Sequence, residues 1–181
     1  MACDSVLYRF EVELSDSDRG VFTSLSFRAP FHPSEAPSFF AARVLAYCLH
    51  FQDGLEMSQG VSDTELPALR MVGPDGSVPL WIEVGQPSAE RLHKASKTGA
   101  RVLVYSHKEP YQYLKNLSGG KIHRASDIKV YSFEPGFLEA VGRALGRDNR
   151  WSLTVTGGTL YLSAGGKDLT SERREASPAA G

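Results

Sequence analysis

One carboxylate stands where an apolar residue is expected. Glu83 lies in the segment Leu80-Trp81-Ile82-Glu83-Val84, whose other members are apolar and predict a strand. Burying a carboxylate is costly unless it pairs with a cation, which can be a protein side chain or a metal ion. Glu83 is therefore interpreted as one half of a salt bridge to Arg91 or Lys94, or as a ligand of a metal or substrate.

Three cationic side chains that could serve phosphate chemistry follow Glu83 in the sequence. Arg91, Lys94 and Lys97 fall in a helix expected over residues 87–98. Side chains of a helix lean towards its N-terminus, so Lys94 could point back to the end of the Glu83 strand. There it would neutralise charge that develops on a phosphate, while Arg91 and Lys97 bind the substrate. The alternative is that these cations form a solvated helix face.

The segments that must position these residues alternate between helix and strand. Hydrophobic periodicity over residues 35–106 predicts a helix (35–52), three strands (55–61, 69–72 and 78–85), a helix (87–98) and a strand (102–105). Ser34 is expected to cap the first helix. The strand with Glu83 is expected to be central in its sheet and parallel to the strand at 102–105, which is apolar throughout.

Further elements flank this central section. Alternating apolar and polar residues predict an N-terminal β-hairpin with arms at 6–14 and 21–27. The C-terminal part is predicted to contain a helix (111–117), a strand (128–133), a helix (137–145) and a hairpin (151–162) that turns at Gly157-Gly158. Residues 1–164 are thus expected to form one domain. The small and polar residues 165–181 are expected to be a disordered tail.

The order helix, three strands, helix, strand resembles the core of the PD-(D/E)XK nucleases. The expected fold class is α/β: a restriction-endonuclease-like αβββαβ core with an N-terminal β-hairpin and a C-terminal α/β extension. Such nucleases hold a divalent cation with an acid on one core strand and a Glu-x-Lys on the next, and the cation activates water. Oxygen-rich sites of this type suit Mg²⁺ or Mn²⁺. Gly85 stands where the strand lysine would be, so Lys94 would have to replace it.

The motifs also resemble those of the YaeQ family of bacterial proteins, over residues 5 to about 163. The match is strongest at Trp81-Ile82-Glu83-Val84-Gly85-Gln86-Pro87 with Arg91 and Lys94-Ala95, and extends to His32-Pro33-Ser34-Glu35, Arg43, Ala46-Tyr47 and Gly60-Val61-Ser62. The resemblance implies a compact variant of the restriction-endonuclease-like fold. It also implies that Glu83, Lys94 and Glu35 line the equivalent of the nuclease site.

The chain departs from the family pattern after Gly60-Val61-Ser62. The family usually has an acidic stretch and then Glu-Pro-acid-x-Trp, whereas this chain has Leu66, Ala68 and Arg70 in place of the two acids and the tryptophan. Asp63 and Glu65 in the preceding loop are the remaining acids that could complete a Mg²⁺ site with Glu83. Such losses are typical of a degenerate or a divergent enzyme.

Composition restricts the partners and the compartment. The 181 residues carry a formal net charge of −1, whereas proteins that coat nucleic acid through its phosphates usually have a basic excess. Any nucleic-acid site must therefore be local. The two cysteines form no disulfide framework, the N-terminus is unlike a signal peptide, and no apolar run approaches the roughly 20 residues of a membrane span. A cytoplasmic protein without membrane contact is expected.

One segment has a composition that could contact a nucleic-acid strand. Tyr111 and Tyr113 lie among Lys108, Lys115 and Lys121, and bases stack on aromatic rings while lysines bind phosphates. An ordinary surface helix is the favoured interpretation of the same residues.

Two functions from different classes fit these residues. The first is a Mg²⁺-dependent nuclease that acts on nucleic-acid phosphodiesters, with Glu83 and a loop acid on the metal and Lys94 near the phosphate. The second is a protein that retained the fold, lost the metal site and became a binding or regulatory module, with a protein as a further candidate partner. The missing acids favour the second function and the retained Glu83, Arg91 and Lys94 favour the first.

Overall fold

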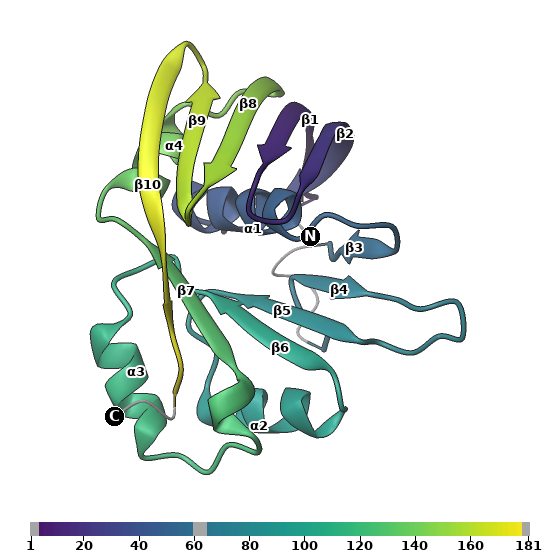
Figure 1. Cartoon of the computed structure of the whole chain (residues 1–181), viewed down its shortest axis with the longest axis vertical. Helices are drawn as coiled ribbons and strands as arrows, with labels where there is room; N and C mark the ends of the chain where they lie inside the picture. Colours follow the sequence, from purple (N-terminus) through teal and green to yellow (C-terminus); the bar gives the residue numbers. More distant parts are fainter. Residues whose placement is uncertain (1–3, 60–64, 179–181) are drawn as a thin grey trace.

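A mixed sheet of ten strands and four α-helices make up the part of the chain that the structure describes, residues 4–59 and 65–178 (Figure 1); the structure is a computed structural model. The strand order is β2-β1-β8-β9-β10-β7-β6-β5-β4-β3. The strands are β1 (Val6–Asp16), β2 (Val21–Phe31), β3 (Leu55–Met57), β4 (Leu69–Met71), β5 (Leu80–Val84), β6 (Arg101–Tyr105), β7 (Lys129–Phe133), β8 (Asp148–Thr156), β9 (Thr159–Ala164) and β10 (Lys167–Ala176). The helices are α1 (Pro37–Leu49), α2 (Ala89–Lys97), α3 (Tyr111–Ser118) and α4 (Phe137–Arg143).

The element order α1-β3-β4-β5-α2-β6 is the one that the sequence predicts for residues 35–106. β3, β4 and β5 form antiparallel pairs within the sheet, and β6 is parallel to β5, with Glu83 opposite Val104. The two expected hairpins are also present. β1 pairs antiparallel with β2, and β8 turns into β9 at Gly157 and Gly158, both of which have the positive φ that favours glycine in a tight turn.

The disordered tail expected from residue 165 is wrong for Lys167–Ala176, which form β10. This strand joins the two halves of the sheet: its first six residues pair with β9 and its last four pair with β7. The segment is polar because it is largely exposed, with Ser171 its one fully buried position. Its order comes from backbone hydrogen bonds to two neighbouring strands, and composition does not report such bonds.

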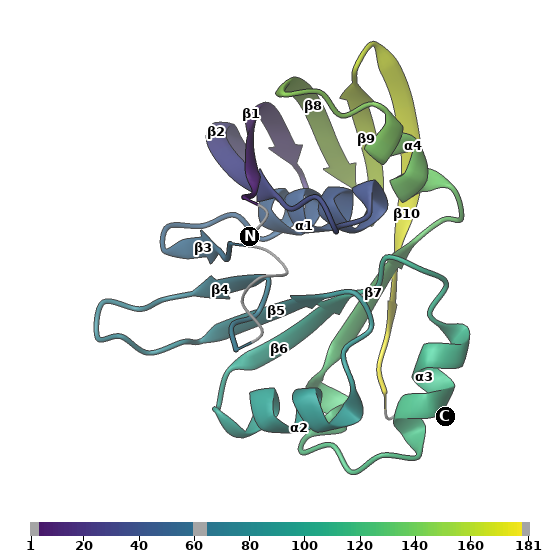
Figure 2. The same cartoon turned by 180° about the vertical axis from the view of Figure 1, so that it is seen from behind.

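Helix α1 lies between the two halves of the sheet, as Figures 1 and 2 show from opposite sides. The largest core cluster packs its side chains against β1, β5, β6 and β8, and Phe40, Val44 and Cys48 are fully buried together as the helical spacing predicts. The helix begins at Pro37 with Ala36 as its N-cap, so Ser34 does not cap it. The Ser34 hydroxyl instead lies 2.6 Å from Nδ1 of His32.

Helices α2 and α3 cover the other face of β5, β6 and β7. Alternate residues of β5 and β6 divide between the two faces: Ile82 and Leu103 pack in the cluster with α1, whereas Val102 and Val104 pack with Leu92 of α2. Trp81 contacts this second cluster, so β5 presents Trp81 and Glu83 to the side of α2. No helix in the described part of the chain is long and apolar enough to cross a membrane.

Candidate functional site

Two side chains hold Glu83: Trp81 of the same strand, β5, and Arg91 of the following helix, α2. Its carboxylate is buried, with 5% of the residue exposed. Nε of Arg91 donates to Oε1 at 2.7 Å, and the indole nitrogen of Trp81 donates to the same oxygen at 2.9 Å. Nη2 of Arg91 also donates to the carbonyl of Leu66 at 3.0 Å. The salt bridge that the sequence left as one of two alternatives is therefore present, and its cation is Arg91.

Local geometry explains why Arg91 reaches Glu83. Trp81 and Glu83 are two residues apart on β5 and so project from the same face of the sheet. Ser88 caps α2 by accepting a hydrogen bond from the Arg91 amide at 3.2 Å, which places Arg91 in the first turn. A long side chain that leans towards the N-terminus of the helix then points to the strand that precedes α2.

Lys94 and Lys97 lie on the solvent side of α2. The Lys94 ammonium is 3.2 Å from Oε1 of Glu90, one turn earlier in the helix, and both side chains are about three-quarters exposed (74% and 79%). Lys94 does lean towards the N-terminus of α2, but the carboxylate it meets there belongs to Glu90. Lys97 is also exposed.

Glu35 forms a separate buried ion pair on the far side of the sheet. Its carboxylate accepts from Nε of Arg43 at 2.7 Å and from Nη2 at 3.0 Å, and it also accepts from the His32 amide at 3.2 Å. Arg43 further donates to the carbonyl of Pro30, so the pair sits between α1 and β2. Glu83 faces α2 instead, and the two glutamates therefore do not belong to one site.

Asp63 and Glu65 are the two acids that were expected to complete a metal site with Glu83. Asp63 lies outside the described residues. Glu65 is exposed and lines a groove of about 470 Å³ beside α2. We call this the α2 groove; its lining residues are Glu65, Trp81, Ser88, Glu90, Arg91, Lys94, Ala95 and Thr98. The groove thus contains both side chains that hold Glu83, together with two acids and one further cation.

Among the described residues, the groups around Glu83 do not fit the ligand set of a Mg²⁺ ion. A Mg²⁺ ion needs carboxylate oxygens that can turn towards it, and Oε1 of Glu83 already accepts from a guanidinium and an indole. Within residues 4–59 and 65–178, three or more His, Cys, Asp or Glu side chains do not converge as a metal-ligating group. Position 68, where the sequence resemblance leads us to expect an acid, is the half-buried Ala68.

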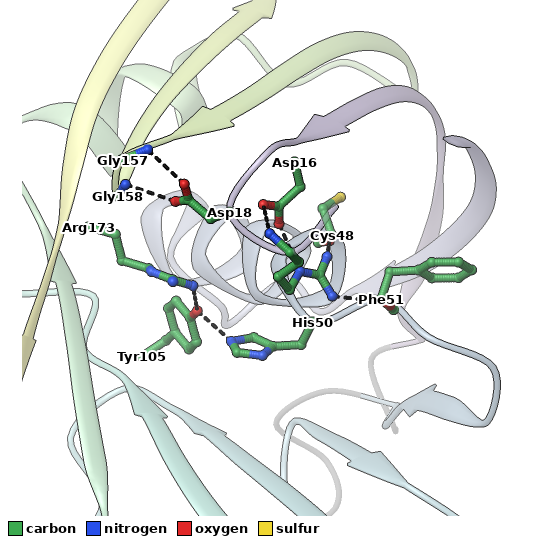
Figure 3. A network of polar contacts seen from close by, with 10 residues as sticks. Asp16, Asp18, Cys48, His50, Phe51, Tyr105, Gly157, Gly158 and Arg173 are labelled. Atoms are coloured by element: carbon green, nitrogen blue, oxygen red, sulfur yellow. Dashed lines mark hydrogen bonds and ion pairs between the residues drawn. The ribbon is translucent and has the colours of Figure 1, made fainter. Parts of the chain in front are cut away.

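A second polar cluster joins α1, β6 and β10 where the two halves of the sheet meet (Figure 3). The Tyr105 hydroxyl is 2.7 Å from Nε2 of His50 and accepts from Nη1 of Arg173 at 3.1 Å. The Arg173 guanidinium also lies over the Tyr131 ring, 4.6 Å from its centroid. Burial lowers the pKa of His50 to about 3, and the charge of Arg173 acts in the same direction, so His50 is neutral at physiological pH.

Neighbouring contacts in the same view attach the β1–β2 turn to the rest of the protein. Asp18 accepts from the amides of Gly157 and Gly158 at 2.7 and 2.8 Å, and these two bonds lower its pKa. Arg19 pairs with Asp16 at 2.8 Å and donates to two carbonyls at the end of α1, those of Cys48 and Phe51. The sequence interpretation missed this cluster because it assigned Arg173 to a disordered tail.

Comparison with known proteins connects these features to one family. The family described as YaeQ protein matches residues 1–173. Proteins named "Uncharacterized protein YaeQ" from Escherichia coli (strain K12) and Salmonella typhi are each 24% identical over 164 residues, which is 90% of this chain and 91% of each relative. A crystal structure of YaeQ protein from Xanthomonas axonopodis pv. citri is similar with a TM-score of 0.85 and 28% identity, over 94% of this chain and 97% of that one. That of YaeQ protein from Pseudomonas syringae has a TM-score of 0.81 and 27% identity, over 94% and 95%.

Proposed function

Since this chain belongs to the YaeQ family, we propose that it keeps a restriction-endonuclease-like core and uses it for binding rather than for phosphodiester cleavage. The order α1-β3-β4-β5-α2-β6 supports the first half of this proposal, as do the shared sheet of β3, β4 and β5 and the parallel pairing of β5 with β6. The state of Glu83 supports the second half.

The contact between Arg91 and Glu83 is the observation that carries the proposal. A catalytic carboxylate of this fold holds a divalent cation, and the cation activates water and stabilises charge on the phosphate. Here a guanidinium lies 2.7 Å from the carboxylate oxygen, and arginine stays protonated at every physiological pH. Arg91 thereby supplies the positive charge that a metal would supply, in a form that cannot activate water.

Two further features agree with a binding role. Leu66 and Ala68 stand where the family resemblance leads us to expect acids, so two carboxylates that could serve as metal ligands are absent at these positions. Lys94, the lysine expected to face the phosphate, forms an exposed pair with Glu90. What remains beside Glu83 is the α2 groove, whose lining includes Trp81, Arg91 and Lys94 together with the acids Glu65 and Glu90, and so offers ring, cationic and carboxylate groups to a ligand.

Thermal melts and nuclease assays, each with and without Mg²⁺, test the proposal. The wild type should show no rise in melting temperature with Mg²⁺ and no cleavage of single- or double-stranded DNA or RNA, because Arg91 competes for the Glu83 carboxylate. Arg91→Ala removes this competitor. A Mg²⁺-dependent rise in melting temperature that appears in this variant but not in the wild type would show that Arg91 keeps Mg²⁺ from Glu83. Glu90→Gln is the matched control, because it breaks the exposed pair with Lys94 and leaves the contact between Arg91 and Glu83 in place.

A Mg²⁺-dependent nuclease is the competing function, and it makes the opposite forecast. The wild type would then melt at a higher temperature with Mg²⁺ and would cleave nucleic acid. Glu83→Gln would abolish both effects, and Glu90→Gln would leave both intact. Cleavage that disappears in Glu83→Gln would overturn the proposed function.

A further inference from the structure

Positive charge is concentrated in one layer of this nearly neutral protein. Residues 88–127 contain eight lysines and arginines but three acidic residues, a net charge of +5 in a chain whose total is −1. This segment comprises α2, β6, α3 and the 3-10 turn Ala125–Asp127, and its helices form the outer surface of the β5-β6-β7 half of the sheet. We call it the basic layer.

The cations of the basic layer are largely free to meet a ligand. Arg91 pairs with Glu83 and Lys94 pairs with Glu90. The other six have no carboxylate within 4 Å among residues 4–59 and 65–178, and all six are exposed: Lys97, Arg101, Lys108, Lys115, Lys121 and Arg124. Unpaired cations on α2, α3 and the segments that follow these helices raise the local potential, which a polyanion lowers on binding. Lys108 instead lines a pocket beside α4, together with Glu109, Glu134 and Glu139.

Two hydrogen bonds connect the parts of the layer to one another. The Tyr113 hydroxyl donates to the carbonyl of Pro87 at 2.8 Å, which attaches α3 to the start of α2. The His123 amide donates to Nδ1 of His93 at 3.1 Å, which attaches the loop after α3 to the middle of α2. The lysines of α2, α3 and the connecting loop are thus held by a fixed framework.

The layer also contains a hollow and an exposed aromatic ring. A pocket of about 250 Å³ is lined by Arg101 and Arg124, with Asp127 and Ser96 beside them. Tyr111, at the start of α3, is 71% exposed and shares a helix face with Lys115. Tyr113 is not available to a ligand, because it is buried at 8% exposure.

We infer that the basic layer binds single-stranded nucleic acid, with Lys97, Lys115 and Lys121 on the phosphates and Tyr111 stacked on a base. Lysines along a surface bind a phosphodiester backbone without regard to sequence, and an exposed tyrosine adds stacking that accepts any base. The inference names the partner of the proposed binding module, and so it rests on that function. It places the strand on α2 and α3 and leaves Glu83 outside the contact.

Fluorescence anisotropy with labelled oligo(dT) and oligo(U), in EDTA so that no metal-dependent cleavage occurs, tests the inference. The variant Lys97→Glu/Lys121→Glu should weaken binding at least tenfold, whereas Arg28→Glu/Lys167→Glu should change it less than twofold. The control makes the same change in charge at two exposed residues of β2 and β10, away from the layer. Each phosphate contact that is lost should reduce the slope of log affinity against log salt by about 0.7.

Tyr111→Ala gives a second, charge-neutral readout. It should weaken binding by roughly 5- to 150-fold, the range expected for the loss of one base stack. Tyr161→Ala is its control, since Tyr161 is 51% exposed on β9 in the other half of the sheet. The ratio of oligo(dT) to oligo(U) affinities separates DNA from RNA as the source of the strand.

Equal effects of the layer variants and their controls would overturn the inference, as would binding of anionic vesicles in preference to both oligonucleotides. The outcomes are separable from those of the cleavage assay. Binding through the layer together with Mg²⁺-dependent cleavage would refute the proposed function and keep the nucleic-acid surface. If the protein neither binds the oligonucleotides nor cleaves nucleic acid, the nucleic-acid surface is refuted. The proposed function then stands, with a different partner.

Discussion

Nε of Arg91 lies 2.7 Å from Oε1 of Glu83, and this pair spans the junction between the strand that carries the family motif and the helix that follows it. The Glu83 side chain is buried and the Arg91 side chain is one-third exposed. Loss of either side chain leaves the charge of the other uncompensated. The pair therefore contributes to the stability of the protein and also determines whether the Glu83 carboxylate can bind another cation.

Arg91→Ala should lower the free energy of unfolding by about 2–4 kcal/mol, less than for a fully buried pair because Arg91 is partly exposed. The variant leaves the Glu83 carboxylate buried beside Trp81 without a cation. Urea denaturation measures the change. Lys94→Ala, which removes an exposed partner, should cost under about 1 kcal/mol. Equal losses in the two variants would show that Glu83 does not depend on Arg91.

Arg43→Ala should cost about 3–5 kcal/mol, since it leaves the Glu35 carboxylate buried between α1 and β2 with no cation. Both side chains of this pair are almost completely inaccessible to solvent. The measurement is again the free energy of unfolding in urea. Arg28→Ala, at an exposed position of β2, serves as the control and should stay within about 0.5 kcal/mol of the wild type. A small effect of Arg43→Ala would contradict the assignment of Glu35 to a structural pair.

His50 should make stability fall as the pH drops below 6.5. Its pKa is about 3 in the folded protein and near 6.5 when unfolded, so both states are neutral above pH 6.5 and the stabilisation is then complete. Between pH 6.5 and 3 only the unfolded chain binds the proton. Each pH unit in this window should remove about 1.4 kcal/mol of unfolding free energy.

The His50 effect can be isolated by comparison with His50→Gln. The gap in unfolding free energy between wild type and variant should narrow as the pH is lowered from 7.5 to 5. His123→Gln, at an exposed histidine, should run parallel to the wild type over the same range. Parallel curves for all three proteins would mean that His50 titrates normally in the folded state.

Deletion of residues 167–181 should destabilise the protein severely. It removes the strand that pairs with both β9 and β7 and the Arg173 that donates to Tyr105. A truncation at a disordered tail would leave the melting temperature unchanged, so a melt distinguishes the two cases. Arg173→Ala in the full chain separates the loss of the Tyr105 contact from the loss of the strand, and should lower the melting temperature less than the deletion does.

The sequence by itself determined the local elements and one electrostatic requirement. Alternation of apolar residues predicts β1 and β2, the glycine pair at 157 and 158 predicts the β8–β9 turn, and the αβββαβ order follows from periodicity because each of these signals lies within one element. The requirement is that Glu83, an acid among apolar residues, needs a cation beside it.

Only the tertiary structure decided which cation meets which acid. Arg91 and Lys94 are equally plausible partners of Glu83 in sequence, and the packing of α2 against β5 turns Arg91 inwards and Lys94 to Glu90. Glu35 falls on the opposite face because α1 lies between the two halves of the sheet. β10 was missed for the same reason: its strand exists through hydrogen bonds to β9 and β7, distant segments whose approach depends on the whole fold and not on the composition of residues 167–176.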